Sequence, residues 1–183
     1  MVRMGEALHS QLAQTAKEQH ISLNQVCLRF LENGLNPSKE EALWRSAALS
    51  LIVPLKKKFG KSLLGVAAFG SQVQGTATPS SDLDLLVILD NSVAIKRELY
   101  VGWDELAQWS GPIKVVNPHF VHLPADAAEA GGLWLEVALH HDILFEQGKK
   151  VSAMLAAILA FIREGKIVRL FSNGHPYWVK EAS

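Results

Sequence analysis

Apolar residues recur at helical spacing in two stretches near the start of the chain, residues 8–16 and 23–31. Positions three and four apart share one face of a helix, so the pattern predicts two short amphipathic helices. Ser22 stands where its hydroxyl can cap the second helix, and Asn33-Gly34 is expected to end it in a left-handed turn. Two helices of this length cannot enclose a core alone, so we expect them to pack on other residues or on a second copy.

The pattern changes after residue 38. Residues 41–59 again have near-helical spacing, which Pro54 is expected to kink or shift. Two apolar runs of strand length follow, residues 62–69 and 83–89, each bounded by turn-forming residues. Residues 113–123 predict a further strand, and its Pro118 favours an edge position or a bulge. The remaining elements expected are an alanine-rich helix over 151–161 and a hairpin over 166–179 with its turn at 173–174.

Composition and charge limit the function classes. The 183 residues are 49% hydrophobic and 20% charged, which disfavours intrinsic disorder and fits one domain with or without a small appendage. No run predicts a membrane span or a secretory signal, and Cys27 is the single cysteine, so a reducing cytoplasm is the expected location. Residues 1–61 carry a net charge of +4 and residues 62–183 one of −4. The positive part permits a nucleic-acid or phosphate partner, and a solvated surface explains it equally well.

The first 36 residues also contain a sequence motif that suggests a function. Residues 21–25, Ile-Ser-Leu-Asn-Gln, with the spacing of the apolar residues before them, resemble the ribbon-helix-helix module of HicB-like antitoxins. The resemblance implies a homodimer in which a strand containing Arg3 enters the DNA major groove and the amides from Ser22 to Asn24 face a phosphate. Only four residues precede the first turn, so the strand is short. A dimerisation module without DNA reading is the alternative.

Two aspartates head the second apolar run. Asp82 and Asp84 are separated by one residue, and side chains alternate along a strand, so both carboxylates are expected on one side while Leu83 and Leu85 face the core. Adjacent carboxylates repel one another unless a cation lies between them. The pair therefore predicts a site for a divalent metal such as Mg²⁺, with an exposed acidic turn as the alternative.

A glycine-containing loop precedes this acid pair. Gly70 follows the first apolar run and permits close approach of a ligand to the backbone, Ser71 offers hydroxyl and amide donors to a phosphate, and Gly75 frees the next turn. No lysine follows the second glycine, which excludes a Walker loop. A phosphate loop beside a metal-ready acid pair is typical of phosphoryl or nucleotidyl transfer.

Gly70-Ser71, Gly75 and residues 81–84, Ser-Asp-Leu-Asp, resemble the signature of the DNA polymerase beta-like nucleotidyltransferase superfamily, in particular its minimal, MNT-like branch. The resemblance implies an α/β (α+β) domain over residues 39–183, with a small mixed sheet flanked by helices and followed by a helix and a hairpin. It also implies a nucleoside triphosphate held by Gly70 and Ser71, and Mg²⁺ or Mn²⁺ held by Asp82 and Asp84. A third carboxylate on a later strand would help to activate the acceptor.

That third carboxylate is missing from residues 113–123. We expect His119 at the matching position, or Asn117 or Val121 if the register shifts. A neutral histidine can act as a general base, and a packed or solvated side chain is the alternative.

Acidic residues farther along the chain are the other candidates for the missing group. They are Glu136, Asp142 and Glu146, for which solvated positions are the simpler explanation. Arg169 on the predicted hairpin either contacts a phosphate or base or belongs to a surface hairpin.

The residues favour a metal-dependent nucleotidyltransferase that moves a nucleoside monophosphate from a triphosphate to an acceptor, with Asp82, Asp84 and His119 as catalytic residues. The acceptor is a protein hydroxyl or a nucleic-acid end, and a toxin–antitoxin system with a toxin partner is the expected setting. Two alternatives remain. One is an inactive, dimeric, DNA-binding regulator or antitoxin, and the other is a sensor that binds the triphosphate without transferring it.

Overall fold

The computed structural model describes residues 5–18, 22–35, 39–78, 80–106, 115–172 and 175–180. The chain divides into two compact units, Met1–Ala42 and Leu43–Ser183. Arg3 and the turn at 173–174 lie outside the described residues, as do residues 113–114 of the expected third strand.

The first unit contains helices α1 (Glu6–Glu18) and α2 (Leu23–Leu35). Ser22 caps α2 as expected: its hydroxyl accepts from the Gln25 amide at 3.2 Å, and the Gln25 side chain accepts from the Ser22 amide at 2.9 Å. This reciprocal pair satisfies two amides at the start of the helix. The expected stop at Asn33-Gly34 is wrong, because α2 continues through both residues to Leu35. Glycine permits the left-handed turn without requiring it, whereas Pro37 disfavours helical backbone at the residue before it.

The second unit is built on a four-stranded mixed sheet of order β3-β2-β1-β4. Its strands are β1 (Leu63–Phe69), β2 (Leu83–Leu89), β3 (Val116–His122) and β4 (His141–Glu146). β1 runs antiparallel to β2 and to β4, while β2 and β3 are parallel. β3 is an edge strand, which confirms the prediction made from Pro118. The fold is therefore the mixed α/β class that the sequence indicated.

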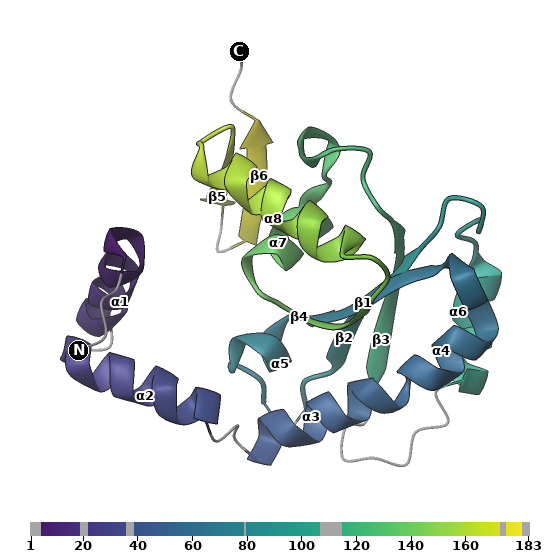
Figure 1. Ribbon diagram of the computed structural model, residues 1–183, viewed down its shortest axis with the longest axis horizontal. Coiled ribbons are helices and arrows are strands. Elements are labelled where there is room, and N and C mark those ends of the chain that lie inside the picture. The colour runs from purple at the N-terminus through teal and green to yellow at the C-terminus, as the bar shows by residue number, and fades with distance from the viewer. Residues whose placement is uncertain are drawn as a thin grey trace. The chain divides into compact units, whose positions relative to one another are not determined.

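Helices cover both faces of this sheet (Figure 1). One face packs against α3 (Lys39–Ser50), α4 (Ile52–Phe59) and α6 (Arg97–Leu106), and the other against α7 (Gly132–Leu139) and α8 (Lys150–Arg163). The expected helix over 41–59 is divided into α3 and α4 at Leu51. Pro54 explains the break, because a proline nitrogen cannot donate to the carbonyl four residues earlier. Short helices occur at α5 (Ser71–Gln74), η1 (Gly60–Ser62) and η2 (Ala127–Glu129).

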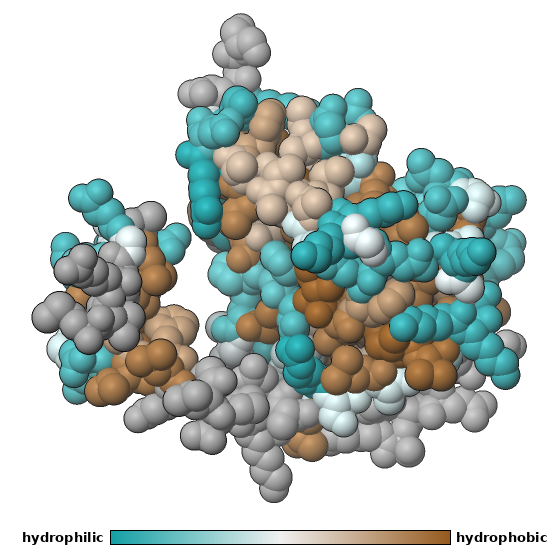
Figure 2. All heavy atoms as spheres, in the orientation of Figure 1, coloured by the Kyte–Doolittle hydropathy of each residue, from teal (hydrophilic) through white to brown (hydrophobic). Residues whose placement is uncertain are grey.

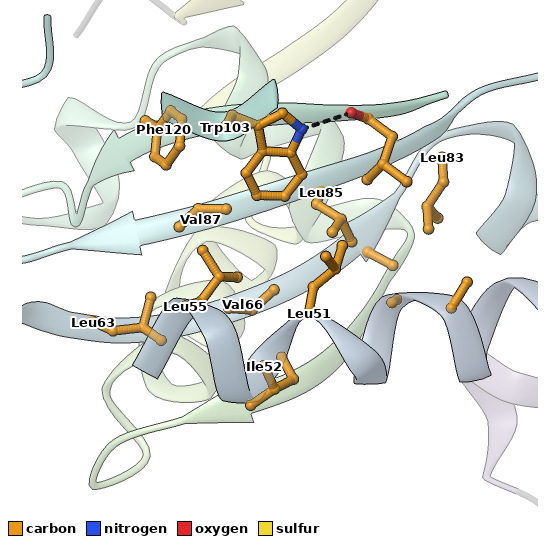
Figure 3. Close-up of a cluster of buried hydrophobic side chains, with 14 of the residues drawn as sticks. Leu51, Ile52, Leu55, Leu63, Val66, Leu83, Leu85, Val87, Trp103 and Phe120 are labelled. Carbon is orange, nitrogen blue, oxygen red and sulfur yellow. Dashed lines mark hydrogen bonds between the residues drawn. The ribbon is translucent and has the colours of Figure 1, made fainter. Parts of the chain in front are cut away.

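The alternation of side chains along β2 divides the core into two clusters. Leu83, Leu85 and Val87 point toward α3, α4 and α6, as Figure 3 shows, whereas Leu86 and Ile88 join the cluster beneath α7 and α8. The indole nitrogen of Trp103 donates to the Val116 carbonyl at 3.1 Å, which fixes α6 to the start of β3 (Figure 3). β2 is thus buried on both faces, and Asp84 is the one residue of this strand that is partly exposed.

The last helix and the hairpin complete the unit. Val151, Leu155 and Ile158 form the buried stripe of α8, while its outer face is alanine-rich and gives the pale brown area over this helix in Figure 2. β5 (Ile167–Ser172) and β6 (His175–Lys180) form the antiparallel hairpin that the sequence predicted. Among the described residues, no helix has the length and apolar character needed to cross a membrane.

Candidate functional site

Gly70 lies at the end of β1 in a conformation that only glycine adopts readily. Its φ is 77° and its ψ is −158°, a region essentially closed to residues with a side chain. A Cβ at this position would lie 2.5 Å from the Asp84 Oδ2 atom. The backbone conformation therefore requires glycine here, and a Cβ would also have to displace the Asp84 carboxylate, which lies directly against the loop.

The loop after Gly70 is tied to the start of β2. Ser71 begins the four-residue helix α5, where the first amides have no helical acceptor, and Gly75 ends it with a φ of 69°. The Gln72 side chain donates to the Ser81 carbonyl at 3.3 Å, and the Ser81 hydroxyl accepts from the Thr78 amide at 2.9 Å. These bonds hold the segment that carries Asp82 beside the segment that carries Ser71.

β3 supplies two neutral side chains to the two aspartates. In the parallel register Asn117 lies beside Asp84, and His119 lies beside Leu86. The Asn117 Nδ2 donates to Asp82 Oδ2 at 3.0 Å, and the His119 Nε2 lies 3.4 Å from Asp84 Oδ1. The structure thus brings together four of the residues considered from the sequence.

The contact between His119 and Asp84 indicates which ring nitrogen of a neutral His119 would carry the proton. A carboxylate only accepts hydrogen bonds, so in the neutral ring Nε2 donates to Asp84 and Nδ1 keeps its lone pair. The ring also packs edge-on against Phe69, with ring centroids 5.2 Å apart. The His119 side chain is 40% exposed, so solvent or a substrate can reach it.

The register separates the three positions considered for the missing third carboxylate. Asn117 and His119 both contact an aspartate, whereas Val121 pairs with Ile88 farther along the strand and packs in the cluster beneath α7 and α8. The sequence favoured His119 and did not predict the Asn117 bond. Period-two spacing was the available signal, since residues 117 and 119 share one face of a strand.

Asp82 and Asp84 are the residues that can hold a metal. Within the described ranges, no group of three or more His, Cys, Asp or Glu side chains is arranged to hold an ion. Mg²⁺, however, is commonly bound by one or two carboxylates together with waters and substrate phosphates. The hard oxygen donors of this pair, beside a loop with free amides, fit a cation that is shared with a bound nucleotide.

The three other acids considered from the sequence have partners elsewhere. Glu136 receives two bonds from Arg169, at 3.0 and 2.7 Å, and one from the Trp178 indole at 2.8 Å. Asp142 pairs with Arg45. Glu146 accepts from the Ser152 amide at 3.0 Å, near the start of α8.

These contacts correct one expectation. The three acids are not simply solvated. Arg169 lies on the hairpin, one of the two alternatives expected for it, and its bonds to Glu136 join that hairpin to α7. None of the three is available as the missing carboxylate without breaking its own contact, because each already balances a cation or a helix end.

The residues expected to face DNA lie in the first unit. Asn24 is exposed on the first turn of α2, next to the capping residue Ser22. Ser22 is itself exposed, and its hydroxyl is engaged with Gln25. The Ser22 amide already donates to the Gln25 side chain, so it is not free for a phosphate, and the DNA role of Ser22 and Asn24 stays a prediction.

Comparison with known families supports both resemblances stated from the sequence. The profile of the nucleotidyltransferase domain family matches residues 52–151, and that of the HicB family matches residues 1–31. No curated protein matches the chain. The two resemblances are thereby confirmed.

Similar solved structures include three toxin–antitoxin complexes. A toxin–antitoxin with AMP-PNP has 16% identity and a TM-score of 0.41, with 64% of this chain and 89% of that chain covered. The toxin–antitoxin MntA-HepT has 14% identity and a TM-score of 0.41, with 66% and 89% covered. A Shewanella oneidensis complex of tri-AMPylated HEPN toxin with MNT antitoxin has 14% identity and a TM-score of 0.42, with 67% and 89% covered.

Proposed function

The chain belongs to the nucleotidyltransferase domain family, and from this premise we propose that residues 43–183 bind a nucleoside triphosphate with Mg²⁺ or Mn²⁺ and transfer its nucleoside monophosphate to an acceptor. The observation that supports this most is the fit of Gly70 against Asp84. A Cβ at residue 70 would lie 2.5 Å from the Asp84 Oδ2 atom and would displace that carboxylate. The phosphate loop and the acid pair are therefore parts of one site.

Each part of the site has a separate task in this proposal. The free amides at Ser71 and the loop after Gly70 bind the phosphates of the triphosphate. Asp82 and Asp84 hold the divalent cation. When bound, the cation would neutralise negative charge on the phosphate oxygens. The Asn117 amide keeps the Asp82 carboxylate in place through its 3.0 Å bond.

In this proposal His119 is the general base that removes the proton of the acceptor hydroxyl. During transfer the acceptor oxygen forms a bond to the α-phosphorus, the bond from that phosphorus to the bridging oxygen breaks, and pyrophosphate leaves. The free Nδ1 of His119 takes the acceptor's proton, while Nε2 remains hydrogen-bonded to Asp84. The acceptor is a protein hydroxyl or a nucleic-acid end.

Transfer of label tests this proposal. The chain is incubated with α-labelled ATP, Mg²⁺ and lysate from its own host, and the label that becomes covalently attached to protein or nucleic acid is measured. We expect transfer by the natural chain and none by Asp82→Asn/Asp84→Asn. Equal labelling by the two proteins would reject the site.

Heat stabilisation tests binding apart from chemistry. A ligand bound only by the folded state at a hundred times its Kd stabilises it by about 2.7 kcal/mol. Mg²⁺ with ATP should therefore raise the Tm of the natural chain and leave the Tm of Asp82→Asn/Asp84→Asn unchanged. Equal shifts in Tm would place the nucleotide elsewhere.

The HicB match over residues 1–31 favours a second candidate function, that of a dimeric, DNA-binding regulator or antitoxin whose nucleotide site acts as a sensor. Neutral side chains on β3 agree with binding that does not lead to transfer. Fluorescence anisotropy with labelled DNA from the promoter of its own gene tests this function. Binding that falls with salt and is lost in Arg3→Ala would support this function, and binding that is unaffected by either would reject it.

A further inference from the structure

A group of exposed lysines lies at the end of the sheet opposite the candidate site. The last turn of α4 contains Lys56, Lys57 and Lys58, and Lys61 follows in η1. Hydrophilic side chains cover this end of α4 in Figure 2. β1 begins just after these residues and is seven residues long, so about 20 Å of strand separates them from Gly70.

Tertiary contacts bring two more lysines to the same end. The Gln147 side chain donates to the Leu63 carbonyl at 2.8 Å, and the Gln147 amide donates to the Leu64 carbonyl at 2.9 Å. These bonds tie the turn between β4 and α8 to the start of β1, directly after η1. That turn leads into Lys149 and Lys150, which are both exposed. The six lysines therefore come from two segments that are distant in the chain.

Few negative charges offset these lysines. Among the described residues, none of the six lies within ion-pair distance of a carboxylate, and Lys150 acts on Asp90 only at longer range. The acids in these segments or bonded to them are Asp90, whose backbone amide donates to η1, and Glu146. Both carboxylates already accept a backbone amide, from Ser92 and Ser152 respectively. Six lysines and two acids leave this surface with a net charge of +4.

The chemistry of this surface points to a ligand with many phosphates. Clustered positive charges attract a partner that has a dense negative charge. A lysine ammonium group binds a phosphate as a point charge, and the phosphates of a nucleic acid repeat at short intervals along its backbone. We propose that residues 56–61 and 149–150, here called the basic end, bind the phosphate backbone of a nucleic acid. This inference does not rest on the transfer proposed above.

An anionic membrane fits the basic end less well. Stable attachment to a membrane takes a second signal besides a polybasic patch, such as an apolar group that inserts between the lipids. On α4, Ile52 and Leu55 are buried in the core, and Val53 is the exposed large apolar residue. One valine offers little area for insertion, so the charge of the basic end is its main means of binding.

Fluorescence anisotropy of the full chain with labelled nucleic acid tests the proposal. The probes are a DNA duplex of arbitrary sequence and a single-stranded RNA, each about 20 nucleotides long. Each lysine–phosphate contact adds about one to the slope of log K against log salt concentration. We expect Lys57→Gln/Lys61→Gln/Lys150→Gln to bind roughly tenfold more weakly than the natural chain at about 50 mM salt, with a slope shallower by about 2 to 3. All three side chains are exposed, so the Tm should not change.

Arg163→Gln/Lys166→Gln/Lys180→Gln is the matched control. It removes the same charge from exposed positions at the end of α8 and on the hairpin, and it should bind nearly as tightly as the natural chain. Equal losses in the two variants would assign the effect to net charge alone and overturn the proposal. So would equal binding by the natural chain and the basic-end variant, or binding to phosphatidylserine vesicles without binding to either nucleic acid. Failure of label transfer would reject the proposed function and leave this inference standing.

Discussion

The carboxylates of the second unit are compensated in two different ways. Glu136 meets a built-in cation, since Arg169 donates two bonds to it and the Trp178 indole a third. Among the described residues, the side chains that contact Asp82 and Asp84 are those of Asn117 and His119, neither of which has the permanent charge of an arginine. An acid whose charge is balanced by the protein itself stabilises the fold, whereas acids balanced by neutral donors still attract a cation from solution. This difference distinguishes a structural acid from a candidate ligand more clearly than residue type does.

Exposure alone does not separate the two groups. The Glu136 and Arg169 side chains are 31% and 33% exposed, and the Asp84 side chain is 29% exposed. What differs is the charge of the partner and the position of the acid in the fold. Glu136 joins α7 to the hairpin, while Asp82 and Asp84 stand where β2 emerges from the core beside the Gly70 loop.

Among the single substitutions considered, the largest effect is expected at His119. Loss of a positioned general base typically lowers a rate by about a hundredfold to ten-thousandfold, or roughly 3 to 5 kcal/mol of barrier. His119→Ala should therefore lower kcat for labelled transfer at least a hundredfold, with little change in the KM for ATP. Added imidazole should restore part of the rate. If His119→Ala leaves kcat unchanged, His119 is a packing residue and not a general base.

Glu136→Gln should lower the stability of the fold more than the same change at a metal-ligand candidate. Hydrogen bonds to charged groups contribute about 1.5 to 3 kcal/mol, and Glu136→Gln weakens the paired bonds from Arg169. We expect the free energy of unfolding in urea to decrease by an amount within that range, without loss of nucleotide binding. Asp84→Asn removes the same charge from the ligand pair and should change the unfolding free energy by less than about 0.5 kcal/mol. Similar losses in the two variants would remove the distinction between the two kinds of acid.

Gly70→Ala should affect both stability and ligand binding. A side chain in this backbone region costs about 1 to 3 kcal/mol, and the new Cβ would also displace the Asp84 carboxylate. The Tm should fall, and Mg²⁺ with ATP should no longer raise it. Gly132→Ala is the matched control, because Gly132 has open space around it and begins α7. Normal ligand stabilisation in Gly70→Ala would show that the loop and the acid pair act separately.

The smallest effect concerns Asp90, just beyond the far end of β2. Its carboxylate accepts from the Ser92 amide at 2.9 Å, and this bond lowers the pKa of Asp90 below its usual value of 3.8. A lowered pKa in the folded state stabilises the protein above pH 3.8, and that stabilisation is lost as the pH falls through the folded-state value. Asp90→Ala should be slightly less stable at neutral pH, and the difference should shrink in acid. A difference that persists unchanged in acid would contradict this.

Much of the fold followed from local patterns. The apolar runs predicted β1 and β2 because buried strands need continuous apolar sequence, and Pro118 predicted an edge strand because it lacks a donor. Ser22 predicted its own cap, since that bond spans three residues. Gly34 misled because its conformation depends on whether the helix can continue, which glycine alone does not decide.

The sequence by itself determined the residue types of the site: two same-face carboxylates, a glycine at the end of β1 and a third strand without an acid. Only the tertiary structure decided which neutral residues meet those carboxylates and which distant acids are already paired. Strand alternation is a local property that sequence spacing encodes. The register between β2 and β3, and the pairing of Glu136 with Arg169 across 33 residues, arise from packing between elements that are far apart in the chain.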